Sequence, residues 1–284
     1  MTALVPFSKG DDPLGPPARA QRHTGARGAG SARAYAGMAE VWAADAALAY
    51  APLARHLVGR SDLDLRGRSA LDAGAGSGAA GDALRAAGAR VVAVDLEVDM
   101  VRYGLAAGPA LAADVTALPF RDSCFDLAVA AFVVNHLEHP VAGLVELRRI
   151  TRPSGTVLVS VFSTARSAAK TAIDEVAGAY GYIAPDWYRQ MQHHARTIGT
   201  VEAMTRALRA AGFTRFRVTD DPVDLGLRDP ALIVRHRTGM AQMRPFVAGL
   251  SPGRRKAFLA EAAEAVARTG GVLAPAVIEV VAQW

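Results

Sequence analysis

Cysteine and lysine are scarce in this 284-residue chain, and long apolar runs are missing. The single cysteine, Cys124, excludes an intramolecular disulfide framework and favours a cytoplasmic protein in which this thiol is a small buried apolar residue. No apolar run approaches the roughly 18 residues of a membrane-spanning helix. The N-terminus, MTALVPFSKGDDPLGPP, also lacks the charged-then-apolar order of a signal peptide. A hydrophobic fraction of 51% favours a packed globular protein.

The positive charge is concentrated at one end of the chain. Lysine occurs only at Lys9, Lys170 and Lys256, so arginine supplies the other 29 of the 32 basic residues. Residues 1–34 carry +3 of the net +5, and their Gly, Pro, Ala and Arg content predicts a flexible basic tail. Because this tail lacks interleaved aromatic residues, the sequence disfavours a nucleic-acid partner.

From about residue 35 onward, apolar segments alternate with helical patterns. Several of the expected strands are apolar on both faces, as in a parallel sheet covered by helices on both sides. Five strands are expected in this part of the chain: SALDA, RVVAVD, PALAAD, FDLAVAAF and TVLVSVF.

After residue 162 the rhythm changes. Residues 163–199 form a helical, aromatic-containing insert, and an amphipathic helix and the strand TRFRVTD follow it. Residues 229–268 predict two more helices, and AVIEVVAQ predicts a final strand. We therefore expect one α/β domain over residues 35–284, with an insert at about 163–199.

A glycine-rich stretch, LDAGAGSGAAGDAL, lies at the first strand-to-helix turn. This position in an open α/β sheet binds ligands, because glycine lets the backbone approach closely and the helix presents free N–H groups. Gly74, Gly76 and Gly78 follow Asp72, and Asp95 ends the next strand, where a carboxylate can bind ribose hydroxyls. A nucleoside-containing cofactor is the first inference.

These residues alone leave the cofactor open. Gly76, Gly78 and Gly81 satisfy the dinucleotide fingerprint G-x-G-x-x-G, and Asp95 lies about where the acidic ribose partner belongs. An NAD-dependent dehydrogenase therefore fits this stretch as well.

Four segments in order extend this pattern along the chain: LDAGAGSG, VVAVDLEVDMV, AADVTALPFRDSCFDLAVAAFVVNHLEHP and LVELRRITRPSGTVLVSVF. With them the chain resembles the class I S-adenosylmethionine-dependent methyltransferases, in the broad subgroup that includes quinone and natural-product methyltransferases. The resemblance is close over about residues 69–162 and looser afterwards, and the family's RPGG turn is RPSG here. It implies a Rossmann-like, doubly wound, seven-stranded sheet that is mostly parallel, with the last strand antiparallel between those of TVLVSVF and RFRV.

The resemblance also implies roles for single residues. Asp72 would lie near the methionine end of S-adenosylmethionine, Asp95 would bind the ribose, and Leu96 would cover one face of the adenine. Asp114 and the N–H of Val115 would bind the adenine edge, and Tyr35 would close over the methionine moiety. The predicted cofactor-binding residues are Tyr35, Asp72, Gly74, Gly76, Gly78, Asp95, Leu96, Asp114, Val115 and Phe132. S-adenosylhomocysteine would be the product.

Methyl transfer from a sulfonium needs alignment, desolvation and, for a hydroxyl acceptor, a base. His136, just past the fourth strand, is the candidate base, because its ordinary pKa suits the task; its alternative role is pocket wall. No cluster in the sequence has convincing metal-ligand spacing, so no metal is expected.

The insert supplies the candidate acceptor-binding residues. Tyr180, Trp187 and Tyr188 could line a flat organic substrate, with His193 or His194 at its polar end; alternatively, the aromatic residues only pack a helical cap. The leading function is methyl transfer to an O, N or C atom of a small specialised metabolite. The alternatives are an RNA methyltransferase and a cofactor-binding protein with another role. The sequence leaves the oligomeric state open.

Overall fold

The computed structural model describes residue 37, residues 39–165 and residues 167–284. The tail predicted over residues 1–34 and the predicted cofactor residue Tyr35 lie outside this part of the chain. The strands are β1 (Ser69–Ala73), β2 (Arg90–Asp95), β3 (Ala110–Ala112), β4 (Phe125–Ala131), β5 (Thr151–Phe162), β6 (Arg215–Pro222) and β7 (Ala276–Gln283).

All of these strands belong to one seven-stranded sheet with the order β3-β2-β1-β4-β5-β7-β6. Strands β1 to β5 are parallel, whereas β7 lies between β5 and β6 and is antiparallel to both. This confirms the predicted fold class, including the antiparallel last strand. Parallel neighbours need a crossover, and helices supply the connections between β1 and β2, β2 and β3, and β4 and β5.

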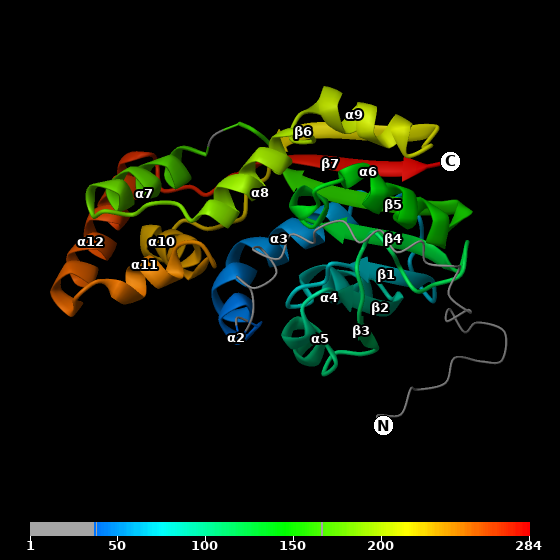
Figure 1. Cartoon of the computed structure of the whole chain (residues 1–284), viewed down its shortest axis with the longest axis horizontal. Coiled ribbons are helices and arrows are strands. Elements are labelled where there is room, and N and C mark those ends of the chain that lie inside the picture. The colour runs from blue at the N-terminus through cyan, green and yellow to red at the C-terminus, as the bar shows by residue number, and fades with distance from the viewer. Residues whose placement is uncertain (1–36, 38, 166) are drawn as a thin grey trace.

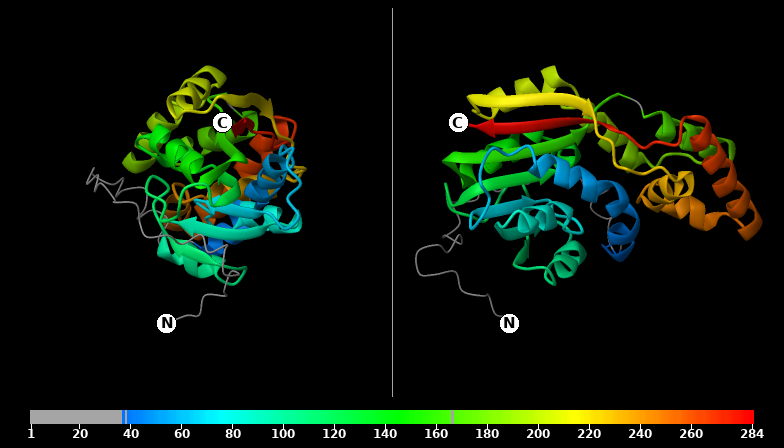
Figure 2. Two further views of the ribbon diagram at one scale, coloured as in Figure 1. Left: turned by 90° about the vertical axis from the view of Figure 1, so that its right-hand side faces the viewer. Right: turned by 180° about the vertical axis from the view of Figure 1, so that it is seen from behind.

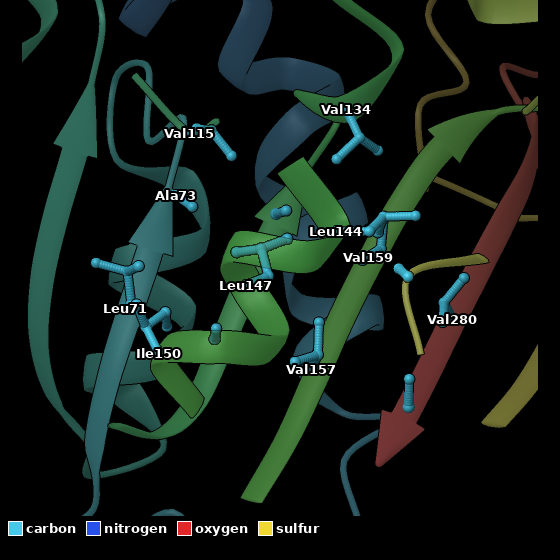
Figure 3. Packing of buried hydrophobic residues seen from close by; sticks show 14 of the residues in the cluster. Leu71, Ala73, Val115, Val134, Leu144, Leu147, Ile150, Val157, Val159 and Val280 are labelled. Carbon is cyan, nitrogen blue, oxygen red and sulfur yellow. The ribbon is translucent and has the colours of Figure 1, made fainter. Parts of the chain in front are cut away.

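Helices cover both faces of the sheet. The side chains of Leu71 and Ala73 on β1 lie in one buried cluster with Leu144, Leu147 and Ile150 of α6 (Pro140–Ile150) (Figure 3). The same cluster includes residues of α9 (Val201–Ala210). Ala70, one residue along, faces the other side, where α3 (Ala47–Val58) and α4 (Ala79–Ala86) lie. Cys124 packs half-buried against the first of these cores, and burial raises the pKa of its thiol to about 11.

A helical lobe extends from the carboxyl ends of the parallel strands (Figures 1 and 2). Two of its helices come from the insert and three from the segment between β6 and β7. Two were expected in that second segment, but Met240–Met243 leaves the helix, and the next two helices each begin with a proline in their first turn. The lobe contains α7 (Ala168–Ala179), α8 (Asp186–Arg196), α10 (Pro230–Gly239), α11 (Arg244–Gly249) and α12 (Pro252–Arg268).

The remaining short elements lie where the strand ends meet the lobe. They are α2 (Ala39–Val41), the π-helix η1 (Trp42–Ala46), α5 (Val98–Gly104) and the 3-10 helix η2 (Val134–His136). Helix η1 continues directly into α3, so the first described helical segment crosses the edge of the sheet next to the glycine-rich turn (Figure 1). Across residues 39–165 and 167–284, no helix combines the length and the apolar character needed to cross a bilayer.

Candidate functional site

The glycine-rich loop between β1 and α4 is the centre of the site. Gly74, Gly76 and Gly78 have φ angles of +70°, +54° and +95°, in the left-handed region that other residues rarely adopt. Space is equally restrictive at Gly74, because a Cβ atom there would lie 2.3 Å from Cγ2 of Val133. The loop therefore places bare backbone at the carboxyl end of β1, and Gly78 is the N-cap of α4.

Two carboxylates lie beside this loop. Asp72 is 1% exposed, and its Oδ2 accepts the backbone N–H of Gly81 at 2.7 Å. Burial raises the pKa of Asp72 to about 7, and the charge of Asp95 adds to the shift. Both oxygens of Asp95 accept backbone N–H groups, from Gly76 at 2.7 Å and Glu97 at 2.9 Å, and burial raises the pKa of this carboxyl as well. Each Asp95 oxygen keeps a lone pair for a ligand.

A cavity of about 570 Å³ connects the two carboxylates. Buried carboxyl groups with raised pKa values are stabilised by a ligand that brings positive charge or hydrogen-bond donors. A nucleoside with ribose hydroxyls and a cationic tail, such as S-adenosylmethionine, would supply both to these carboxyl groups. Four of the predicted cofactor-binding residues line the cavity: Asp72, Gly76, Gly78 and Asp95. Residues that were not predicted also line it, among them Ala75, Ser77, Asp82, Arg85, Met100 and Arg102.

An apolar group closes the site on the side of the helical lobe. Met100 of α5 packs in one cluster with Trp42 of η1, Trp187 of α8 and Ala241. The indole nitrogen of Trp42 lies 3.7 Å from the point where a Cβ atom of Gly76 would be. Trp42 thus lies over the glycine-rich loop, and α8 reaches the same place from the lobe.

Four aromatic rings pack against one another, beginning with Trp42 of this apolar group; we call them the ring cluster (Trp42, Tyr50, Phe132 and Phe162). Tyr50 is its centre, with ring centroids 5.6 Å from Trp42, 5.3 Å from Phe132 and 6.1 Å from Phe162. Phe132, predicted as a cofactor contact, has a φ of +58° directly after β4, an uncommon conformation for an aromatic residue. Its strained backbone turns the chain toward Val133, which covers Gly74. Phe162 is 36% exposed, so the cluster is not sealed.

His136 lies at the end of η2, close to the end of β4 as predicted. Its ring is half-buried, and burial lowers its pKa to about 4. The neighbouring Asn135 is 6% exposed, and its Oδ1 has no hydrogen-bond partner within the described part of the chain. Helix α8 packs against η2, so the lobe also covers this end of β4.

The residues predicted to hold the adenine do not line the cavity. Leu96 is 52% exposed, whereas Val115 is 5% exposed and packs in the core of the sheet. The Oδ1 atom of Asp114 accepts the backbone N–H and the hydroxyl of Thr116 at 2.8 and 2.7 Å. Leu96, Asp114 and Val115 follow the ends of strands, as Phe132 does, but none of these four residues lines the cavity. Their cofactor roles stay predictions.

The predicted acceptor-binding residues lie in several places. Trp187 reaches the cluster with Met100, and His193 and His194 are exposed and half-buried on α8, with ring centroids 6.2 Å apart. Tyr180 instead packs on α12, where its hydroxyl donates to Oε1 of Glu261 at 2.7 Å. Of these five residues, only Trp187 belongs to the apolar group next to the cavity.

A buried ion pair joins three helices of the lobe. Arg237 of α10 is 7% exposed, and its Nε and Nη2 bond Oδ1 of Asp174 on α7 at 2.9 and 2.8 Å. The guanidinium carbon lies 6.0 Å from the ring centroid of Tyr188 on α8. Tyr188 is therefore a packing partner of Arg237, and the pair fixes α8 to α7 and α10.

Sequence reasoning did not identify Trp42 and Tyr50 as site residues, nor the contact of α10 with η1. Trp42 and Tyr50 are eight positions apart on one helix, a spacing that puts both on one face and could have indicated a shared role. Helix α10 is far away in sequence, and only tertiary contact brings it to η1. Among residues 39–165 and 167–284, no three His, Cys, Asp or Glu side chains are grouped as metal ligands.

Comparisons with known proteins point in one direction. A family model for a methyltransferase domain matches residues 71–159. A demethylmenaquinone methyltransferase of Mycobacterium sp. (strain JLS) is 33% identical over 161 residues, which are 53% of this chain and 70% of that protein.

Solved structures share the fold. A protein assigned as a methyltransferase of an antibiotic biosynthesis pathway in Anabaena variabilis superposes with a TM-score of 0.60 at 16% identity, over 82% of this chain and 96% of that one. Haemonchus contortus phosphoethanolamine N-methyltransferase 2, in complex with S-adenosylhomocysteine, gives a TM-score of 0.54 at 15% identity. That match covers 81% of this chain and 52% of the other, so the chain spans about half of that protein.

Proposed function

The chain belongs to the class I S-adenosylmethionine-dependent methyltransferases, and on this premise we propose that it methylates an O, N or C atom of a flat, small organic acceptor. The cavity between Asp72 and Asp95 is the observation that carries the proposal. It combines a glycine-rich turn, a helix N-terminus and two buried carboxylates at the carboxyl ends of parallel strands. These features together suit a cationic nucleoside.

We propose the following roles for the residues of the cavity. Asp95 accepts hydrogen bonds from ribose hydroxyls, and ionised Asp72 balances the positive charge of the methionine end. Gly74, Gly76 and Gly78 allow the backbone to approach the ligand. The bound cofactor supplies a methyl group activated on a sulfonium, so the protein has to align the acceptor and exclude water.

The ring cluster supports a flat acceptor. Tyr50, Phe132 and Phe162 contact one another, and Phe162 is 36% exposed. Exposed aromatic rings bind planar ligands well. Trp187 closes the same region from α8. The relative from Mycobacterium is named for a quinone acceptor, which is also planar. The remaining predicted contacts, Tyr180, Tyr188, His193 and His194, would need the lobe to change its arrangement before they line an acceptor.

The competing functions differ in the acceptor. An RNA methyltransferase would transfer the label to RNA, and a protein that uses the cofactor otherwise would transfer none. The single cysteine is compatible with a reducing compartment, and we propose a cytoplasmic location on that ground.

Transfer of a labelled methyl group tests the proposal directly. The protein is incubated with methyl-labelled S-adenosylmethionine and, in separate reactions, with reduced demethylmenaquinone, a panel of hydroxylated naphthalenes, and total RNA. Label in a small molecule is the expected result. Label in RNA alone, or in no acceptor including a cell extract, would contradict it.

Cofactor binding is tested by calorimetry with S-adenosylhomocysteine. Asp95→Ala should weaken binding by at least about tenfold, on the scale of one hydrogen bond to a charged group. Asp82→Ala is the matched control, because Asp82 lines the same cavity but its side chain is 69% exposed. Equal affinities of the Asp95→Ala variant and wild type, or tight NADH binding by wild type, would remove the assignment of this cavity.

A further inference from the structure

The loop between α7 and α8 contains the most exposed large apolar side chain in the described part of the chain, Ile183, which is 78% exposed. Tyr180, by contrast, packs on Phe258 of α12 with ring centroids 5.5 Å apart. Tyr182 packs in the same way on Phe246 of α11, at 5.3 Å. Ile183 is therefore an apolar side chain that folding leaves in solvent, while its neighbours in the loop pack on the lobe.

The backbone of the loop is held on both sides of Ile183. The N–H of Tyr182 donates to the carbonyl oxygen of Ala177 at 2.9 Å. On the other side, Nη1 of Arg189 donates to the carbonyl oxygen of Ala184 at 2.8 Å. A single exposed apolar residue is ordinary on a protein surface, so the charge of its surroundings decides whether it belongs to a binding surface.

Four exposed basic side chains lie on the two helices that hold this loop. Arg244 begins α11, and the third to fifth residues of α12 are Arg254, Arg255 and Lys256. Residues 244–260 contain no Asp or Glu. Within residues 39–165 and 167–284, no carboxylate forms an ion pair with any of the four. The first carboxylate beyond this stretch, Glu261, accepts the hydroxyl of Tyr180 at 2.7 Å.

The charges on α12 are unfavourable for the helix that carries them. The N-terminal end of a helix has a positive partial charge, which favours acidic residues there and disfavours basic ones. The first turn of α12 contains no acidic residue. Arg254 and Arg255 hydrogen-bond only to neutral groups, the backbone carbonyl oxygens of Tyr180, Ala248 and Leu250. Positions that break a local rule of stability are expected at functional surfaces.

An anionic lipid bilayer matches both features of this surface. We propose that the lobe tip, which we define as residues 180–185, Arg244 and residues 254–256, binds such a bilayer. Ile183 enters between the head groups, where its burial removes apolar area from water, and the four cations attract the anionic lipid. The aliphatic stems of the basic side chains lie along the apolar boundary while their charged ends stay with the head groups.

The shape of the molecule leaves the lobe tip accessible to a flat surface. Helix α12 lies at the end of the lobe away from the sheet (Figures 1 and 2). Membrane binding through this end goes beyond methyl transfer, and it does not depend on which acceptor is methylated.

A nucleic acid is the competing partner for a basic surface. Single strands bind by stacking their bases on free aromatic rings as well as by charge. At the lobe tip the rings of Tyr180 and Tyr182 are already packed on phenylalanine rings. Ile183 offers an aliphatic side chain, which suits hydrocarbon and provides no stacking face for a base. The observations therefore favour the bilayer.

Co-sedimentation with vesicles tests the proposal. The full chain is mixed with vesicles of phosphatidylcholine, alone or with about 30% phosphatidylglycerol, at about 0.1 M salt. We expect binding to the anionic vesicles to be at least about tenfold tighter than to the neutral ones, and to weaken as salt is added.

Charge variants locate the surface. Arg244→Gln combined with Lys256→Gln removes two cations whose side chains make no hydrogen bond or ion pair within the described residues. This double variant should bind anionic vesicles about 25-fold more weakly, since each basic residue near an anionic surface contributes about fivefold. Arg206→Gln combined with Arg209→Gln is the matched control, because both arginines are exposed on α9 and the change in net charge is the same. Binding by the control should stay within about twofold, and both double variants should melt within about 2 °C of wild type.

The apolar contact has variants of its own. Ile183→Ser should weaken binding to anionic vesicles by about fivefold or more. Val145→Ser is the matched control, since Val145 of α6 is an apolar side chain that is 43% exposed outside the lobe tip, and binding should stay within about twofold. Ile183→Trp should bind at least as tightly as wild type, and its added fluorescence should shift to shorter wavelength on anionic vesicles.

These measurements decide the proposal. Equal binding of wild type to both kinds of vesicle, or binding to neither, would overturn it. Equal losses in the two double variants would also overturn it, because the attraction would then come from overall charge, including the basic residues of 1–34. Full binding by Ile183→Ser would remove the insertion of that side chain. Binding of total RNA that is lost in the Arg244→Gln, Lys256→Gln variant, without binding to anionic vesicles, would assign the surface to nucleic acid instead.

Discussion

Asp72 combines a cost in stability with its proposed role in binding. Because burial raises its pKa from 3.8 to about 7, the folded chain holds this proton more tightly than the unfolded chain does. The residue therefore favours folding least at high pH: stability from this group is lost as the pH rises from about 4 to about 7 and is constant above that. A cationic ligand reverses the preference, since it stabilises the ionised carboxylate.

We expect Asp72→Asn, which cannot ionise, to raise the melting temperature of the ligand-free protein at pH 8 by about 5 °C or more, and by less at pH 5. The same change should weaken S-adenosylhomocysteine binding at pH 8 by about tenfold or more, because the ammonium group loses its counter-charge. In wild type, binding should strengthen between pH 6 and pH 8. Thermal melts and calorimetry measure both effects, and Asp82→Asn serves as the exposed control. A lower melting temperature for Asp72→Asn at pH 8 would contradict this account.

The sequence predicted the residues of the site whose positions depend on local structure. Asp72 and the glycines lie at the end of one strand, and Asp95 ends its parallel neighbour, so the pattern of strands and turns was enough to bring them together. Trp42 could not be found in this way. Its position over Gly76 comes from a tertiary contact between residues 34 positions apart in the sequence.

At the scale of elements, the contact between η1 and α10 leaves little space, because a Cβ atom at Gly239 would lie 2.5 Å from Cβ of Asp45. A π-helix within an α-helical segment often marks a functional position, and here Asp45 of η1 contacts Gly239 of α10. Gly239 ends α10 at a normal φ, so only space, and not backbone conformation, demands glycine there. The sequence predicted helices over residues 229–268, but the periodicity of their apolar residues could not show that one of them packs against η1.

Gly239→Ala tests this contact. The added methyl group would push α10 away from η1, and we expect a loss of about 1–3 kcal/mol in the free energy of unfolding, the usual cost of overpacking. Gly178→Ala is the matched control: Gly178 lies within α7, a Cβ atom there would have no neighbour within 4 Å, and alanine should stabilise this helix slightly. Equal denaturation midpoints for wild type and Gly239→Ala would show that the contact between α10 and η1 can accommodate the added methyl group.

At the scale of the whole molecule, the sheet is complete only when the last strand is present. The alternation of strands and helices predicted the parallel half, whereas the position of β7 between β5 and β6 came from the resemblance and not from periodicity. In the structure, β7 pairs with β6 on one side and with β5 on the other. Glu279 of β7 is 3% exposed, and its Oε1 bonds Nδ1 of His56 on α3 at 2.8 Å, so β7 also anchors the helix that carries Tyr50.

Deletion of residues 276–284 should therefore abolish the fold and not merely shorten it. Strand β6 would lose its only partner in the sheet, and the buried side chains of Val277, Ile278 and Val280 would leave gaps in the cores on both faces. We expect the truncated chain to lack a cooperative thermal transition and to bind no S-adenosylhomocysteine, although every residue of the cofactor cavity is retained. Deletion of Trp284 alone removes a ring contact with Phe213 at 5.8 Å and the contact of its ring with the guanidinium of Arg148 at 5.4 Å, but no strand pairing, so this control should melt cooperatively and bind the ligand. A truncated chain that melts cooperatively and keeps its affinity would show that the cofactor half folds without its last strand.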